Sequence, residues 1–156
     1  MDLTVAAVGT GMPSRVQEAW SEYAKRFPRG YTLQLKEIPL AKRARNADVK
    51  ALQRAEGEAL LAAVPAGHRI IALDERGRQW STMELALQME NWLQTERGVC
   101  FLVGGPDGLP EQCRQRAQNV WALGKLTLPH PMVRAILAEQ LYRAWTVTQN
   151  HPYHRN

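Results

Sequence analysis

The stretch Val99-Cys100-Phe101-Leu102-Val103-Gly104-Gly105-Pro106-Asp107-Gly108 joins an unbroken apolar run to a glycine-rich turn. Because the run does not alternate between apolar and polar residues, it is typical of a strand buried on both faces of a parallel sheet. A second run of this kind, Ile70-Ile71-Ala72-Leu73, ends at Asp74. Each run is followed by a helical segment, and this order predicts an α/β fold with a mainly parallel sheet flanked by helices.

Strand and helix signals alternate along the rest of the chain. We expect further strands at residues 3–8, 31–38 and 120–123, and helices at residues 13–27, 48–63, 81–93, 110–119 and 132–150. Ser81 and Glu84 have the spacing of a capping box at a helix start. The last helix is expected to bury five positions: Val133, Leu137, Leu141, Ala144 and Thr148. No linker or repeat divides the pattern, so we expect one domain over residues 1–156.

Composition and charge narrow the class of protein. Hydrophobic residues make up 45% of the 156 positions, which is a globular value and excludes wholesale disorder. The 20 Lys and Arg against 15 Asp and Glu give a net charge of +5, which favours a polyanionic partner. Two cysteines do not make a disulfide framework, and the longest apolar run, residues 59–64, is too short to span a bilayer. We therefore expect a soluble cytoplasmic protein without a membrane partner.

Three turns follow predicted strands, at residues 74–77, 104–108 and 124–131. Ligands of open α/β sheets bind beyond the carboxyl ends of the strands. Gly104 and Gly105 let the backbone approach a ligand closely because they have no Cβ. The Gly9-Thr10-Gly11 turn does not match a dinucleotide fingerprint, since a third glycine and a later acidic residue are missing. The sequence predicts a ligand site built from the three turns.

Histidines near the C-terminus raise the question of a metal site. His130 is separated from His151 and His154 by a predicted helix of about 20 residues, roughly 30 Å long. One molecule could hardly bring these imidazoles to one ion, so we expect no metal. No serine lies on a glycine elbow, so a nucleophilic triad is not predicted either.

Basic residues gather in two places. Residues 36–54 hold six of them, Lys36, Lys42, Arg43, Arg45, Lys50 and Arg54. A solvated surface explains this group as well as contact with a nucleic-acid backbone does. Arg134 and Arg143 of the last helix, with Tyr153, His154 and Arg155 of the tail, would extend an RNA surface with base-stacking groups.

Several motifs together resemble one family. They are Gly104-Gly105-Pro106-Asp107-Gly108, Thr127-Leu128-Pro129-His130-Pro131, Glu139-Gln140-Leu141-Tyr142-Arg143-Ala144 and Asn150-His151-Pro152-Tyr153-His154-Arg155. The chain is similar over its whole length to the bacterial ribosomal RNA large-subunit methyltransferase H family. That family belongs to the SPOUT superfamily, whose α/β methyltransferases thread the C-terminal region into a deep trefoil knot. The resemblance therefore implies a knot, which periodicity and composition cannot show.

The resemblance implies transfer of a methyl group from S-adenosylmethionine to N3 of a pseudouridine in a 23S rRNA stem-loop. The implied cofactor residues are Leu73, Gly104, Gly105, Gly124, Lys125, Leu126, Thr127, Leu128 and Pro129. The implied RNA-binding residues are Lys42, Arg43, Arg45, Arg134 and Arg143. The implied partners are 23S rRNA, the large subunit or the whole ribosome, and a second copy of the chain in a homodimer.

The tail and His130 would carry the chemistry. The N3–H of pseudouridine is only weakly acidic, so a general base is needed, and His130 or His154 could accept the proton. Arg155 or a protonated histidine would stabilise the imide anion, and Tyr153 would stack on the base or form a hydrogen bond with it. The proton acceptor, and the subunit that supplies the tail, stay open.

Two other functions are compatible with the sequence. A non-catalytic ribosome-assembly or RNA-binding factor would use the same basic segment. A SPOUT methyltransferase acting on a ribose 2′-hydroxyl of tRNA would share the fold and yield a different product.

Overall fold

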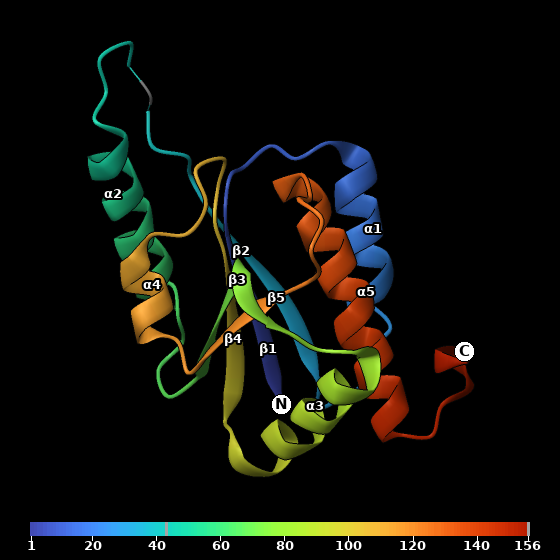
Figure 1. Cartoon of the computed structure of the whole chain (residues 1–156). Helices are drawn as coiled ribbons and strands as arrows, with labels where there is room; N and C mark the ends of the chain where they lie inside the picture. The colour runs from blue at the N-terminus through green and yellow to red at the C-terminus, as the bar shows by residue number, and fades with distance from the viewer. Residues whose placement is uncertain (43, 156) are drawn as a thin grey trace.

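The computed structural model describes residues 1–42 and 44–155. The strands are β1 (Asp2–Val8), β2 (Thr32–Ile38), β3 (Arg69–Gln79), β4 (Gly98–Val103) and β5 (Asn119–Ala122). The helices are α1 (Ser14–Ala24), α2 (Val49–Ala62), α3 (Thr82–Thr95), α4 (Glu111–Arg116) and α5 (His130–Thr148), followed by a 3-10 turn at Pro152–His154. Every strand and helix expected from the sequence is therefore present, with ends shifted by a few residues (Figure 1).

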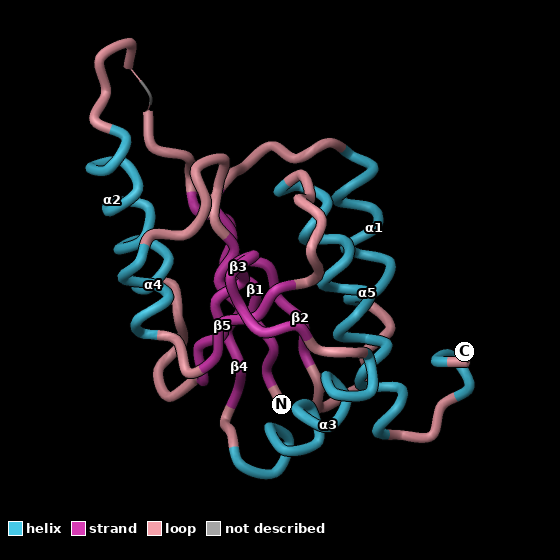
Figure 2. The backbone as a smooth tube through the Cα atoms, viewed as in Figure 1, coloured by secondary structure: helices cyan, strands magenta, loops and turns pink. Residues whose placement is uncertain are grey.

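The five strands form one parallel sheet in the order β2-β1-β4-β3-β5. Helices α2 and α4 cover one face, and α1, α3 and α5 cover the other (Figure 2). All six residues of β4 are buried, as are the last six of β1, because helices lie over both faces. These observations confirm the α/β fold with a parallel sheet flanked by helices.

Polar side chains fix the starts of two helices. The Asp48 carboxylate accepts hydrogen bonds from the backbone N–H groups of Lys50 and Ala51 at the start of α2. At the start of α3, the Ser81 hydroxyl accepts from the Glu84 N–H at 3.1 Å, and the Glu84 carboxylate accepts from the Ser81 N–H at 2.7 Å. The capping box predicted from the sequence is confirmed.

Strand β3 differs from its prediction. It was expected to end at Asp74, but it continues to Gln79 with a register shift between Leu73 and Arg78, both of which pair with Trp121 of β5. A Cβ at Gly77 would lie 2.6 Å from the backbone of Val120, so the irregular segment depends on a glycine. The glycine that indicated a turn in the sequence therefore belongs to a bulge beside β5.

Helix α5 is buried more widely than expected. Leu137, Leu141 and Ala144 are buried as predicted, whereas Val133 and Thr148 are only half-buried. Four further residues are buried, namely Arg134, Ala138, Tyr142 and Thr146. The physical reason is that α5 packs against α1 and α3 as well as the sheet, so neighbours cover more than one stripe.

Two findings concern the class of protein. Cys100 and Cys113 are both free thiols in the core, and burial raises the pKa of each to about 11. In the described part of the chain, none of the helices has the length and apolar character needed to cross a membrane.

Candidate functional site

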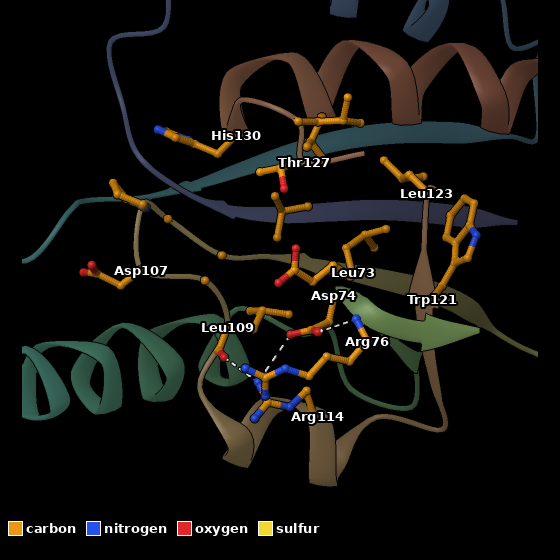
Figure 3. Close-up of a pocket in the computed structure, with 18 of the residues that line it drawn as sticks. Leu73, Asp74, Arg76, Asp107, Leu109, Arg114, Trp121, Leu123, Thr127 and His130 are labelled. Atoms are coloured by element: carbon orange, nitrogen blue, oxygen red, sulfur yellow. Dashed lines mark hydrogen bonds and ion pairs between the residues drawn. The ribbon is translucent and has the colours of Figure 1, made fainter. Parts of the chain in front are cut away.

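A cavity of about 530 Å³ lies beside the ends of β4 and β5 and the irregular segment of β3 that follows Leu73. Seven predicted cofactor residues line it: Leu73, Gly104, Gly105, Gly124, Leu126, Thr127 and Leu128 (Figure 3). Lys125 and Pro129 belong to the same loop but are not among the lining residues. The volume falls in the range of small-molecule sites. The structure thus brings the loops after β4 and β5 and the irregular segment of β3 to one cavity, as the sequence predicted for residues 74–77, 104–108 and 124–131.

The loop after β4 closes on itself. The Gly108 N–H donates to the Gly105 carbonyl at 2.9 Å, and a Cβ at Gly104 would lie 2.5 Å from the Gly108 carbonyl carbon. A Cβ at Gly105 would lie 3.0 Å from Cγ1 of Val8 in β1. Both glycines are therefore needed for the packing of the loop itself, and a side chain at Gly105 would meet β1 before it met a ligand.

An ion pair forms a second part of the cavity wall, which the sequence analysis missed. Nη1 of Arg114 lies 3.3 Å from Oδ2 of Asp74 and donates to the Leu109 carbonyl at 2.7 Å. The other carboxylate oxygen, Oδ1, accepts from the Arg76 N–H at 2.9 Å (Figure 3). The position of Asp74 directly after a buried strand was the available signal, but its partner from α4 was not predictable.

Further carboxylates line the mouth of the cavity, from Glu75, Asp107 and Glu111. Together with Asp74 they give the wall acidic groups that outnumber its arginines, Arg76 and Arg114. Negative potential in a cleft favours a ligand that carries positive charge. A sulfonium with an α-ammonium group is a ligand of that kind.

His130 begins α5 and lines the cavity. Burial, with a smaller effect of the Arg134 charge, lowers the pKa of the imidazole. Its buried Nδ1 atom has no hydrogen-bond partner among residues 1–42 and 44–155. A neutral imidazole has a free nitrogen lone pair, so His130 is able to accept a proton at neutral pH.

The C-terminal tail packs in a different part of the structure from His130. The Tyr153 hydroxyl donates to the Glu139 carboxylate at 3.0 Å, and its ring meets the Tyr142 ring edge-on at a centroid distance of 4.9 Å. The guanidinium of Arg143 is 5.0 Å from the Tyr153 ring centroid, and that of Arg26 is 5.7 Å from it. The tail therefore packs on the C-terminal half of α5 and against Arg26, which follows the end of α1.

This placement separates the tail from the cavity of its own chain. His130 is the first of 19 residues in α5, and at 1.5 Å per residue the helix is roughly 27 Å long. Figure 1 shows the C-terminus at the opposite end of the molecule from the start of α5. One chain does not bring Tyr153, His154 and Arg155 to its own cavity.

The predicted RNA-binding residues differ in exposure and in their partners. Lys42 and Arg45 are exposed before α2, and Arg43 lies outside the described residues. Arg143 pairs with Glu139 and stays a prediction. For Arg134 the prediction is wrong, because only 1% of its surface is exposed and its guanidinium is used inside the protein. Arginine at a helical position gives no sign in the sequence of which way it points.

Metal binding has no geometric basis in the described part of the chain. A search of those residues finds no group of three or more His, Cys, Asp or Glu side chains placed to hold an ion.

Comparisons with known proteins agree with the geometry. Residues 1–154 match a family model described as a predicted SPOUT methyltransferase. The chain is 51% identical over 155 residues to the ribosomal RNA large subunit methyltransferase H of Marinomonas sp. (strain MWYL1), covering 99% of this chain and all of that protein. A solved structure described as a "probable methylase family protein" from Haemophilus influenzae Rd KW20 superposes with a TM-score of 0.55 at 14% identity. That likeness covers 99% of this chain and 70% of the other, and it supports the fold alone. The chain belongs to the SPOUT methyltransferase family.

Proposed function

We propose that this protein transfers a methyl group from S-adenosylmethionine to N3 of a pseudouridine in a stem-loop of 23S rRNA. The observation that carries the proposal is the cavity that His130 lines together with the loops after β4 and β5 and the irregular segment of β3. The 51% identical relative is a large-subunit rRNA methyltransferase by name, which supports the same substrate class. The whole chain, residues 1–156, would be one methyltransferase domain acting in the cytoplasm.

The residues present fit the cofactor. Gly104 and Gly105 line the cavity without side chains, so an adenine would meet their backbone, and Leu73, Leu126 and Leu128 supply apolar walls. The acidic wall around Asp74 suits the positive charges of the amino-acid part. When bound, the cofactor supplies an electrophilic methyl group on sulfur.

His130 is our candidate for the proton acceptor at N3. Its pKa is lowered, so the imidazole is neutral at pH 7, and it lines the cavity. General-base catalysis of this kind contributes typically 10²–10⁴-fold. His154 is the alternative proton acceptor. It would reach a cavity only in a dimer, where the tail comes from the other chain.

We infer that the protein is a homodimer in which each tail completes the cavity of the partner. Tyr153, His154 and Arg155 are far from the cavity of their own chain, so their predicted roles require a second copy. Exposed apolar side chains support an interface beside the cavity, since Leu126, which lines it, is 81% exposed and Met132, two residues after His130, is 44% exposed. In that dimer Arg155 would stabilise the imide anion and Tyr153 would stack on the base.

The RNA would approach from the side of α2. Gln53 of α2 donates to the Asp107 carbonyl at 2.7 Å, which joins this helix to the loop at the cavity mouth. The side chains of Lys50 and Arg54 are exposed on α2, and Lys42 and Arg45 are exposed just before it. These charges would contact phosphates while the base enters the cavity, on the assembled ribosome or its large subunit.

A deep trefoil knot in the C-terminal region belongs to the same proposal. Membership of the SPOUT methyltransferase family supports it, because the resemblance described above implies a knotted C-terminal region. A knot would hold the loop at residues 123–129 against the loop at residues 104–108. Both loops line the cavity.

A methylation assay with nucleoside analysis tests the function. The protein is incubated with radiolabelled S-adenosylmethionine and one of four substrates: 70S ribosomes, 50S subunits, naked 23S rRNA or tRNA. Each substrate is prepared without the methyl group in question. We expect label in 23S rRNA of ribosomal particles and a product with the mass and retention of N3-methylpseudouridine. A 2′-O-methylated tRNA nucleoside would favour the ribose methyltransferase, and no transfer despite RNA binding would favour the assembly factor.

A matched pair of histidine variants tests the proton acceptor. His130→Gln is expected to lower kcat by 10²-fold or more. His68→Gln is the control, since His68 is also half-buried with a pKa lowered by burial but lies at the start of β3, away from the cavity. Equal kcat values for the two variants would exclude His130 as the base.

A further inference from the structure

Arg134 is a fully buried charge with several partners. Its guanidinium donates to the main-chain carbonyl oxygens of Gly9 at 2.7 Å and Val8 at 3.2 Å, and it pairs with the Glu37 carboxylate at 2.8 Å. A buried charge is tolerated only where pairing and hydrogen bonds compensate for lost hydration. The three acceptors therefore hold this side chain in one place.

The acceptors come from the ends of two strands. Val8 is the last residue of β1, and Gly9 follows it. Glu37 of β2 pairs with β1 one position before the two strands end. The Gly9 N–H donates to the Ile38 carbonyl at 2.7 Å, which joins the two strand ends. Arg134 consequently ties the second turn of α5 to the carboxyl edge of the sheet.

The same strand end also supports the cofactor loop. A Cβ placed on Gly105 would be 3.0 Å from Cγ1 of Val8, so the loop after β4 lies directly on this residue. On the other side, a Cβ on Gly9 would be 3.6 Å from Cε1 of His130 and 3.4 Å from the Arg134 guanidinium. His130 lies one helical turn before Arg134. The Val8–Gly9 segment therefore lies next to both the glycine loop and the candidate base.

We propose that Arg134 is a positioning residue for methyl transfer. By binding Val8, Gly9 and Glu37, it sets the separation between the Gly104–Gly105 loop and His130 across the cavity. This inference rests on the proposed function. A misplacement of about 1 Å can lower the rate of an aligned transfer by 10²-fold. Lysine at this position would keep the charge but could not form the forked contacts that the planar guanidinium makes.

The test compares Arg134→Lys and Arg134→Gln with Arg69→Gln as a matched control. Arg69 also has a partly buried guanidinium in a network, with Asn119 at 2.9 Å and Glu96 at 2.9 Å, but it begins β3 at the opposite edge of the sheet. Initial rates of methylation are measured at a temperature at which circular dichroism shows every variant folded. We expect kcat to fall 10- to 100-fold in both Arg134 variants, with KM for RNA within threefold and Arg134→Lys the less affected. Arg69→Gln should keep kcat within twofold.

A kcat loss in the Arg134 variants no larger than in Arg69→Gln would overturn the inference, since it would reduce Arg134 to a stabilising residue. If Arg134→Gln does not fold, Arg134→Lys and Glu37→Gln give the same comparison. A readout without RNA separates this inference from the proposed function. In NMR spectra of the protein alone, the His130 imidazole cross-peak should shift in Arg134→Lys while the His68 cross-peak stays. If the wild type methylates no RNA, the proposed function fails, and an unmoved His130 cross-peak would refute the positioning role.

Discussion

Replacing Gly104 with alanine tests whether the loop after β4 must keep its shape to hold the cofactor. The new Cβ would lie 2.5 Å from the Gly108 carbonyl carbon and 2.6 Å from the Leu109 nitrogen, whereas ordinary contacts begin at 3.4 Å. The loop must therefore open by about 1 Å, the difference between 3.4 Å and 2.5 Å. Overpacking of this size costs about 1–3 kcal/mol.

The strained loop is one wall of the cavity, so we expect much of that cost to appear as lost cofactor affinity. At 1.4 kcal/mol per factor of ten, the Kd for S-adenosylmethionine should rise about 5- to 150-fold. Gly124→Ala is the control, because a Cβ there meets nothing within 4 Å although the residue lines the same cavity. Its Kd should stay within about threefold of the wild-type value.

Isothermal titration calorimetry gives both Kd values, and thermal unfolding by circular dichroism shows whether each variant is folded during the titration. A Gly104→Ala protein that is folded and binds S-adenosylmethionine with the wild-type Kd would refute the reasoning. So would a Gly124→Ala protein that loses as much affinity as Gly104→Ala.

Further predictions concern other parts of the molecule. The pKa of His130 is lower in the folded state than in the unfolded chain, so the free energy of unfolding should fall as the pH drops below about 6.5, and urea titrations of His130→Gln should lack this component. Tyr153→Phe removes a hydrogen bond to a carboxylate and should lower the free energy of unfolding by about 1 kcal/mol, measured by urea titration; an unchanged midpoint would contradict the observed packing of the tail. Because burial raises the pKa of both thiols to about 11, neither cysteine should react with a thiol reagent at pH 8 in the native protein, whereas both should react in urea. Replacing Lys50 and Arg54 by glutamine should reduce the salt slope of RNA binding by about two units, while Arg97→Gln, exposed after α3, should leave it unchanged.

Most of the fold could be predicted because local signals and burial agree. The unbroken apolar run of β4 predicts a buried strand, and the capping box at Ser81 predicts a helix start. The structure confirms both. The loops of the cavity were also predictable, because carboxyl ends of parallel strands meet at one edge. These inferences need only periodicity and chain order.

Side-chain partners between distant segments were not predictable. Arg134 looked like a surface arginine, yet its partners Val8 and Glu37 lie about a hundred positions earlier in the chain. The pairing of Asp74 with Arg114 depends in the same way on where α4 packs. The sequence points to a role for the tail in a cavity but does not show in which copy of the chain, and the hydrogen bond of Tyr153 to Glu139 places the tail along α5, away from the cavity of its own chain. In each case the sequence shows the residue type, and only the tertiary fold shows its partner.

A crystal structure of the full-length protein with S-adenosylmethionine tests the central claim most directly. We predict that the adenosyl group lies between Leu73, the Gly104–Gly105 loop and Thr127, with the methyl group directed toward His130. Binding in the separate cavity of about 340 Å³ beside Trp20, or at any other site away from residues 73–76, 104–108 and 124–130, would contradict the account.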